Sequence, residues 1–239
     1  MSRADLALVT PAISRKEPHM RIQIIEDTVC PWCRIGKHNL HEALDQWTLS
    51  HPGEEIELEY LPYLLDPVEQ GSKENVRERF MKRKGLTPEE VDSTFERVTE
   101  AGKQVGITFN YDKVKVAVDT VPGHELIALT PQEKKAGVIE AIMKAYFEDG
   151  KDIGEDDVLL QAGRDGGLAE EELAEIGPIF ASHVTREAIL GVISSVQQAG
   201  ITGVPFFIID GKLGVSGAQA PASFLQAFDQ AHSMEPAFQ

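Results

Sequence analysis

The sequence predicts an α/β fold in which two β-containing segments are separated by a large helical insertion. Strand-like and helical patterns alternate over residues 20–70, and a helix, two strands and a helix are indicated over residues 184–239. Between residues 71 and 183, apolar residues recur with the helical period and no convincing strand pattern occurs. The expected order is therefore β-α-β, an all-helical insertion, and α-β-β-α.

The N-terminal segment reads as strand, helix, strand. Ile22, Ile24 and Ile25 mark the first strand. The helix follows from apolar positions at spacings of three and four, namely Cys33, Gly36, Leu40, Leu44 and Trp47. The second strand alternates apolar and acidic residues over 56–60. Because parallel neighbours need a crossover connection, this order fits a parallel β-α-β unit.

Helix starts can be recognised within the insertion. Thr87-Pro88-Glu89-Glu90 begins one helix, because the threonine can cap, proline suits the first helical position and the second glutamate can complete a capping box. Thr130-Pro131-Gln132-Glu133 repeats this pattern and predicts a second start. Shorter helical patterns cover 155–161 and 169–176, where the excess of acidic residues predicts a solvated surface.

The C-terminal segment begins with a helix expected over about 185–199, with Gly200 just beyond its end. Residues 201–209 form a turn that leads into a fully apolar strand, and Asp210-Gly211 predicts a hairpin turn. A short return strand at 213–215 and an amphipathic pattern over 224–231 complete the α-β-β-α order.

Composition narrows the classes of function. The 239 residues carry a formal net charge of −16, which disfavours nucleic acid and anionic membranes as partners. No apolar run approaches the roughly 20 residues of a membrane span. Residues 1–19 hold only a short apolar stretch at 6–9, below the roughly 7–15 residues of a signal-peptide core. We therefore expect a cytoplasmic protein whose residues 1–19 form a disordered extension.

Cys30 and Cys33, the two cysteines of the chain, follow the first strand and open the first helix, which is a thioredoxin-like redox arrangement. Free backbone N–H groups at the helix start, the helix dipole and the nearby Arg34 and Lys37 favour the thiolate of Cys30. Cys33, one turn further on, is expected to be the more shielded sulfur.

Two other interpretations of the cysteine pair are weaker. A zinc site would need two further ligands, and His38 and His41 lie in no matching motif. Two buried core cysteines without a redox role are the other alternative, because cysteine can act as a small apolar residue. A redox dithiol is the preferred hypothesis, with no metal and no cofactor.

Pro205 marks a second part of the predicted site. It begins a strand, where its missing N–H is tolerated, and it keeps Val204 extended. In the predicted element order this loop lies beside the start of the first helix. A cis Pro205 would expose the Val204 backbone there, so that a substrate peptide could pair with it while Cys30 attacks the substrate sulfur. A proline that merely starts a buried strand is the alternative.

Three segments together resemble the DsbA-like thioredoxin-fold proteins of the FrnE type, namely Val29–Lys37, Gly203–Phe207 and Ser216–Gln219. The resemblance covers residues 20 to about 232. It implies a DsbA-like thioredoxin fold built from residues 20–70 and 184–239, a helical insertion domain at 71–183, and protein disulfide oxidoreductase activity. Cys30 would be the nucleophile and Cys33 the resolving thiol, Pro205 would be cis, and Pro31, Trp32, Val204 and Pro205 would bind substrate.

The resemblance also implies partners. They are protein, peptide or small-molecule thiols and disulfides, with glutathione or a thioredoxin-type reductant as candidate electron donors and a homodimer as a candidate assembly. Trp32 brings no charge to the motif, so we expect an intermediate reduction potential.

Some residues depart from the family pattern or have no assigned role. In the insertion the family typically shows Asn-Thr … Ala-His-Arg, where this chain has Asp119-Thr120 … Gly123-His124-Glu125. Because the amide and the arginine are lost, the resemblance gives no support for a role of this segment beside the cysteines. We expect His124 to be a buried, hydrogen-bonded core residue. Glu26 and Asp27 are expected by default to be solvated acids at the strand end. If they face the sulfur, they would oppose the thiolate or relay a proton to Cys33.

Two rival functions remain open. Kappa-type glutathione transferases and hydroxychromene-carboxylate isomerases share the fold and the insertion, but they commonly carry serine at the position of Cys30. A peptide-binding, chaperone-like module in which the cysteines are incidental is the alternative from another class.

Overall fold

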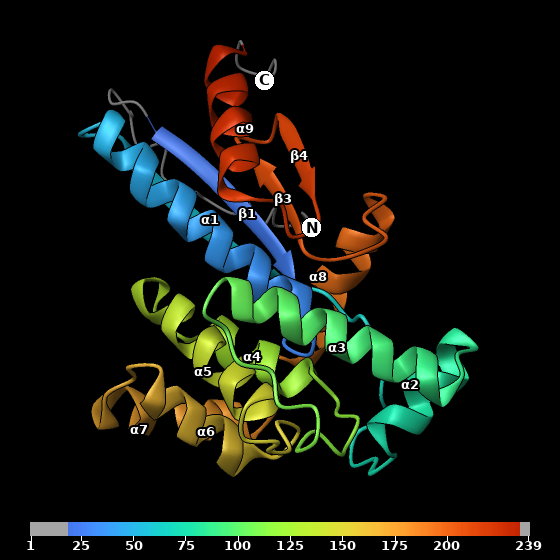
Figure 1. Cartoon of the computed structure of the whole chain (residues 1–239). Coiled ribbons are helices and arrows are strands. Elements are labelled where there is room, and N and C mark those ends of the chain that lie inside the picture. The colour runs from blue at the N-terminus through green and yellow to red at the C-terminus, as the bar shows by residue number, and fades with distance from the viewer. Residues whose placement is uncertain (1–18, 235–239) are drawn as a thin grey trace, which may run out of the picture.

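The structure is a computed structural model that describes residues 19–234 (Figure 1). Its elements in chain order are β1 (His19–Glu26), α1 (Pro31–Ser50), β2 (Glu55–Pro62), α2 (Val76–Lys84), α3 (Pro88–Gln104), α4 (Val121–Leu129), η1 (Gln132–Lys134), α5 (Lys135–Phe147), α6 (Asp156–Asp165), α7 (Glu170–Ala181), α8 (Arg186–Gln198), β3 (Phe206–Ile209), β4 (Leu213–Ser216) and α9 (Pro221–Ser233). The predicted order of elements is confirmed. Of the extension expected to be disordered, residues 1–18 lie outside the described residues and His19 begins β1.

The strands form one sheet in the order β2-β1-β3-β4. β1 runs parallel to β2 and antiparallel to β3, and β3 pairs antiparallel with β4. The predicted hairpin turn is present, because Asp210 and Gly211 both have positive φ, at 52° and 66°. The β-α-β unit and the hairpin thus place the C-terminal ends of β1 and β2 and the start of β3 along one edge of the sheet.

Helices cover both faces of this sheet. α1 and α9 pack on one face, where Ile22 and Ile24 of β1 and Phe207 of β3 meet Leu40 of α1 and Phe228 of α9. On the other face α8 supplies Val196, which packs in a cluster with Ile25 of β1. In Figure 1, helices α2 to α7 gather as a second layer beyond the N-terminal end of α1.

The largest apolar cluster lies in this helical layer. Its fully buried members include Leu126, Ile139, Phe147 and Phe180. The same cluster contains Cys30 and Cys33. The start of α1 therefore lies at the junction between the sheet layer and the helical insertion.

The capping prediction is confirmed at one position and wrong at the other. Thr87 and Glu90 form the expected capping box at the start of α3. Thr130 instead ends α4, where its hydroxyl donates to the carbonyl of Leu126, and α5 begins only after the 3₁₀ turn η1. The sequence pattern did not reveal α4, because Pro122 and Gly123 lie in its first turn and seven of its nine residues are buried, which leaves no amphipathic stripe.

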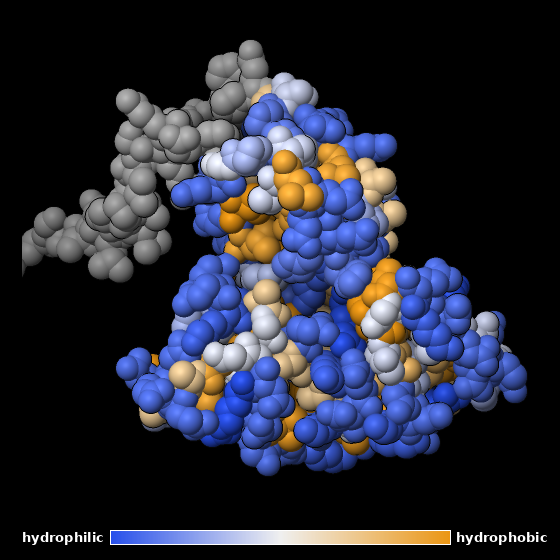
Figure 2. Space-filling model, turned by 60° about the vertical axis from the view of Figure 1, so that its left-hand side comes forward, coloured by the Kyte–Doolittle hydropathy of each residue, from blue (hydrophilic) through white to orange (hydrophobic). Residues whose placement is uncertain are grey.

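Hydrophilic residues cover most of the face in Figure 2, and hydrophobic residues gather there in separate patches. Within residues 19–234 no single helix has the length and apolar composition of a membrane span. The bent pair of α7 and α8, at 81° to each other, meets those two criteria only when taken together.

Candidate active site

Cys30 is the residue that caps the N-terminus of α1. Its extended backbone (φ −94°, ψ 107°) turns the chain from β1 into the helix, and its N–H donates to the carbonyl of Asp27 at 3.0 Å. Pro31 occupies the first helical position, where an N–H would have no partner within the helix. Both cysteines are free thiols. Both residues are buried, with Cys30 2% exposed and Cys33 without exposed surface, so Cys33 is the more shielded of the two, as predicted.

The loop before β3 lies directly against Cys30. The Val204–Pro205 peptide bond is cis. The Cys30 thiol donates to the carbonyl oxygen of Val204 across 3.6 Å. Residues 174 positions apart in the chain are thereby joined at one atom pair. The proximity inferred from the element order is confirmed.

Gly36 allows this close approach. A Cβ atom at this position would lie 3.0 Å from Cγ of Pro205 and 3.3 Å from Cα of Ala218, so a larger residue would push the loop away from α1. The Asn39 amide donates to the carbonyl of Gln219 at 2.9 Å, which fixes the third segment to the same helix. All three segments that carry the family resemblance thus meet around the first three turns of α1. The sequence had placed Gly36 only in an apolar stripe.

Burial raises the pKa of the Cys33 thiol well above its ordinary value. The hydrogen bond with Cys30, the negative charge of the Cys30 thiolate and the charge of Glu26 add to this effect. Cys33 therefore stays protonated until another group removes its proton.

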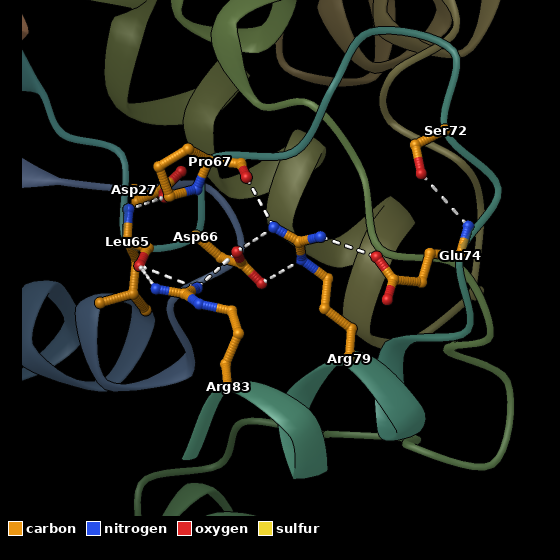
Figure 3. Close-up of polar contacts among 8 residues, drawn as sticks. All are labelled: Asp27, Leu65, Asp66, Pro67, Ser72, Glu74, Arg79 and Arg83. Atoms are coloured by element: carbon orange, nitrogen blue, oxygen red, sulfur yellow. Dashed lines mark hydrogen bonds and ion pairs between the residues drawn. The ribbon is translucent and has the colours of Figure 1, made fainter. Parts of the chain in front are cut away.

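Glu26 and Asp27 are buried, so the default expectation of solvated acids is wrong. Glu26 is 2% exposed and pairs with the Lys37 ammonium at 2.5 Å. Asp27 has no exposed surface, and its carboxylate accepts the Leu65 N–H at 2.7 Å (Figure 3). The reason is topological: β1 is a central strand, and α1 and the helical insertion cover its C-terminal end.

His124 follows the prediction of a buried, hydrogen-bonded core residue. It is 4% exposed, and its Nε2 atom lies 3.1 Å from the carbonyl oxygen of Tyr63 and 3.4 Å from the carboxylate of Asp27. It therefore connects α4 to the turn that holds Cys30.

The sequence suggested that Arg34 and Lys37 are free cations beside the Cys30 thiol, but both are paired with carboxylates. Arg34 pairs with Glu140 at 2.5 Å and with Glu148 at 2.6 Å, both at the α5 side of the insertion. Lys37 pairs with Glu26. Because carboxylates neutralise both cations, neither presents a free positive charge beside the Cys30 thiol.

A cavity of about 290 Å³, the Cys30 cavity, opens beside the nucleophile. On the sheet side it is lined by Val29, Cys30, Pro31, Trp32 and Val204. The structure thus brings four of the predicted site residues to one cavity, while Cys33 and Pro205 are not among its lining residues. Within residues 19–234 no group of three or more His, Cys, Asp or Glu side chains is placed to hold a metal ion.

The insertion supplies the opposite wall of the Cys30 cavity, which the sequence analysis missed. Its aromatic residues are Phe80, Phe95, Tyr111, Tyr146 and Phe147. Phe95 lies in α3, and no local pattern in the sequence indicates that it lines the same cavity as Cys30. Only the packing of the insertion against α1 brings these rings to the site.

Residues 21–229 match the family model described as a DSBA-like thioredoxin domain. The uncharacterized protein YwbO of Bacillus subtilis is 24% identical over 218 residues, which cover 87% of this chain and 95% of YwbO. The fold is similar to that of the probable DsbA oxidoreductase SCO1869 from Streptomyces coelicolor, with a TM-score of 0.79, 24% identity, and coverage of 92% of this chain and 93% of that one.

Two further structures share the fold at lower similarity. The cytosolic disulfide reductase DsbM from Pseudomonas aeruginosa, solved with GSH, has a TM-score of 0.54 and 18% identity over 89% of this chain and 96% of DsbM. A 2-hydroxychromene-2-carboxylate isomerase has a TM-score of 0.58 and 12% identity over 88% of this chain and 95% of the isomerase. At these identities the likeness concerns the fold alone.

Proposed function

We propose that this chain, which belongs to the DSBA-like thioredoxin domain family and is a disulfide oxidoreductase, exchanges thiols and disulfides through Cys30 and Cys33. The observation that carries the proposal is the position of the Cys30 thiol, at the N-terminus of α1 and 3.6 Å from the carbonyl of Val204. Pro31, Trp32, Val204 and Pro205 would form the immediate surroundings of a bound substrate.

The reaction has two exchange steps. In the reduced enzyme the Cys30 thiolate attacks a substrate disulfide, a mixed disulfide forms, and the first substrate thiol leaves and takes up a proton. Cys33 then loses its proton and attacks the sulfur of Cys30. This second step releases the other substrate thiol and leaves a Cys30–Cys33 disulfide. Run in reverse, the same steps oxidise a dithiol.

The raised pKa of the Cys33 thiol keeps the two exchange steps in order. A protonated Cys33 does not compete as a nucleophile before the mixed disulfide has formed. Glu26 lies close enough for its charge to act on Cys33, and it is buried with Lys37 as its partner. We assign Glu26 as the group that accepts the Cys33 proton, which is the second of the two roles considered for it from the sequence.

The finer assignments are part of the same proposal. We place the activity in the cytoplasm, in the reducing direction, with glutathione or a thioredoxin-type protein as the electron donor. The fold shared with DsbM, a cytosolic disulfide reductase solved with GSH, supports this choice. A homodimer stays a prediction.

A glutathione-dependent transferase or isomerase is the second candidate, because the fold is shared with the hydroxychromene-carboxylate isomerase. Cysteine rather than serine at position 30 argues against it. Conjugation of glutathione to an aromatic electrophile would identify that activity. The chaperone-like alternative would keep its activity in a protein with both Cys30→Ser and Cys33→Ser, whereas the proposed exchange requires both thiols.

Turnover of a disulfide substrate tests the proposal. With dithiothreitol as reductant and bis(2-hydroxyethyl) disulfide as substrate, we expect Cys30→Ser to lower kcat/KM by at least about 10³-fold, because the nucleophile is lost. Undiminished turnover in this variant would contradict the proposed role of Cys30. Ser93→Ala, at an exposed position of α3, provides a matched control.

A further inference from the structure

The walls of the Cys30 cavity are mostly apolar, which sets the chemistry of what can occupy it. Six aromatic side chains line it, namely Trp32, Phe80, Phe95, Tyr111, Tyr146 and Phe147. The rings of Phe95 and Tyr111 stack at 4.0 Å, and Phe147 meets Tyr111 edge-on at 6.1 Å. Moving an apolar group from water into contact with these rings would be favourable, because apolar surface is buried on both sides.

The exposure of Cys30 limits how a substrate sulfur can arrive. Cys30 is only 2% exposed, and it lines the cavity. A disulfide must therefore enter the cavity to reach the thiol. A small molecule meets this requirement more readily than a disulfide held on the surface of a folded protein.

The size of the cavity agrees with such a ligand. A dry apolar cavity of about 150 Å³ is enough to bind benzene. The Cys30 cavity, at about 290 Å³, has room for one aromatic ring together with a short chain that carries the sulfur.

The charged lining residues are few and partly committed to each other. They are Asp66, Arg83 and Lys84. Arg83 forms an ion pair with Asp66 and donates to the carbonyl of Leu65 (Figure 3). A glutathione molecule would bring two carboxylates and an ammonium group, which require partners when they are desolvated. Lys84 could pair with one of the carboxylates, but Asp66 and Arg83 already pair with each other, so the lining suits an apolar body better than glutathione.

We propose that the substrates of this site are low-molecular-weight disulfides and thiols that carry an aromatic or similarly bulky apolar body. This inference rests on the proposed thiol–disulfide exchange and adds its substrate class. The apolar body lies between the insertion and Trp32, and its sulfur faces Cys30. Cys30 forms a disulfide with the sulfur of this body, the polar half of the substrate leaves as a thiol, and Cys33 then displaces the body as a second thiol. The two electrons come from the enzyme dithiol, which dithiothreitol restores in the assay.

Two disulfides with similar leaving thiols test the proposal. We would compare kcat/KM for 2-phenylethyl 2-hydroxyethyl disulfide with that for bis(2-hydroxyethyl) disulfide, under dithiothreitol. Burial of the phenyl ring predicts a ratio of roughly 10- to 100-fold in favour of the aromatic substrate. A ratio within twofold of unity would overturn the inference and leave the proposed function standing. Failure to reduce either disulfide would contradict the proposed function itself.

Two tryptophan variants of α3 test the location. Thr94 lines the cavity, and Ser93 is exposed on the same helix and does not line it. Thr94→Trp should lower the ratio of the two kcat/KM values at least about fivefold by filling the cavity, while Ser93→Trp should leave the ratio unchanged. Equal ratios in both variants would overturn the location.

A second cavity variant keeps the test decisive if Thr94→Trp does not fold. Phe80→Ala removes one ring from the α2 side and should lower the same ratio roughly three- to tenfold through lost apolar contact. Insulin serves as a protein substrate. If insulin were reduced with a higher kcat/KM than the aromatic disulfide, and Thr94→Trp did not affect it, the site would act on polypeptides and the inference would be wrong.

Discussion

The two sides of Cys30 are built differently. Toward the sheet, α1 packs directly on the Pro205 loop, and Gly36 leaves no room for a side chain there. Toward the insertion, the neighbour is the Cys30 cavity, and α2, which contributes to its far wall, has no buried side chain. The packed side fixes the geometry of the two sulfurs, and the hollow side determines what can reach them.

Partly exposed ion pairs hold the hollow side. Ion pairs fasten α2 to the segment that follows β2, through Arg79 to Asp66 and Glu74 and through Arg83 to Asp66. Figure 3 shows this cluster beside the Asp27–Leu65 hydrogen bond. Asp27 thus links the turn that holds Cys30 to the ion-paired cavity wall. The following predictions would break or sharpen the contrast.

The largest effect is expected on the packed side, at the buried ion pair. Glu26→Gln leaves the Lys37 ammonium without its carboxylate in a position that is 7% exposed. Breaking a buried pair from one side costs about 3–5 kcal/mol, so the free energy of unfolding should fall by that amount. Urea denaturation of the reduced protein measures it.

The double variant Glu26→Gln, Lys37→Met is the control for this prediction. Removing both charges should restore most of the lost stability, because no charge is then left unpaired. A loss below about 1 kcal/mol in the single variant would show that water reaches the pair.

Gly36→Ala should destabilise the contact between α1 and the Pro205 loop. The added Cβ atom would lie 3.0 Å from Pro205, and overpacking of this kind costs about 1–3 kcal/mol. Gly191→Ala in α8 is the matched control, because a Cβ atom there meets no described atom within 4 Å apart from the backbone of its own helix. Alanine is favoured over glycine within a helix, so the control should gain about 0.5–1 kcal/mol. Equal melting shifts in both variants would contradict the tight contact.

Stability should depend on alkaline pH through Cys33. The pKa of this thiol is raised in the folded state. In the unfolded chain the Cys33 thiol has an ordinary pKa of about 8.5, so above this pH the unfolded state releases a proton that the folded state keeps. The reduced protein should therefore lose stability as pH rises through this window, with a slope approaching about 1.4 kcal/mol per pH unit. Cys33→Ala should show a shallower slope, and identical slopes would contradict the shift.

The smallest effect is expected on the hollow side. Arg79→Ala removes the bonds that hold residues 66–74 to α2, but Arg79 is 19% exposed, so the cost should be about 1 kcal/mol. Amide hydrogen exchange should accelerate in residues 65–84 and stay unchanged in α1. Arg77→Ala, which breaks an exposed pair with Asp92, serves as the control with an expected loss of a few tenths of a kcal/mol. Unchanged exchange in both variants would show that other contacts hold the wall.

The contrast also explains what the sequence could predict. Local patterns identified the strands, α1 and the order of elements, because each of these depends on periodicity within one segment. The position of Cys30 followed from the same reasoning, and the nearness of Val204 followed from topology. The burial of Glu26 and Asp27 was missed, since it depends on β1 being central and on the insertion covering its end.

The cavity wall could not be predicted for the same reason. Phe80, Phe95 and Tyr146 come from three separate elements or loops of the insertion, and no spacing in the sequence relates them to Cys30. Arg34 was misassigned because its partners Glu140 and Glu148 lie more than a hundred residues away. Long-range packing decides these features.

The most direct test of the account is to trap its covalent intermediate. Cys33→Ala should stop the reaction after the first exchange, because no second thiol can displace the substrate from Cys30. Incubation of this variant with 2-phenylethyl 2-hydroxyethyl disulfide, followed by peptide mass spectrometry, should show a mixed disulfide with the phenylethyl thiol on the peptide that contains Cys30. A Cys30 peptide that stays unmodified while the intact enzyme turns over the same disulfide would contradict the central claim.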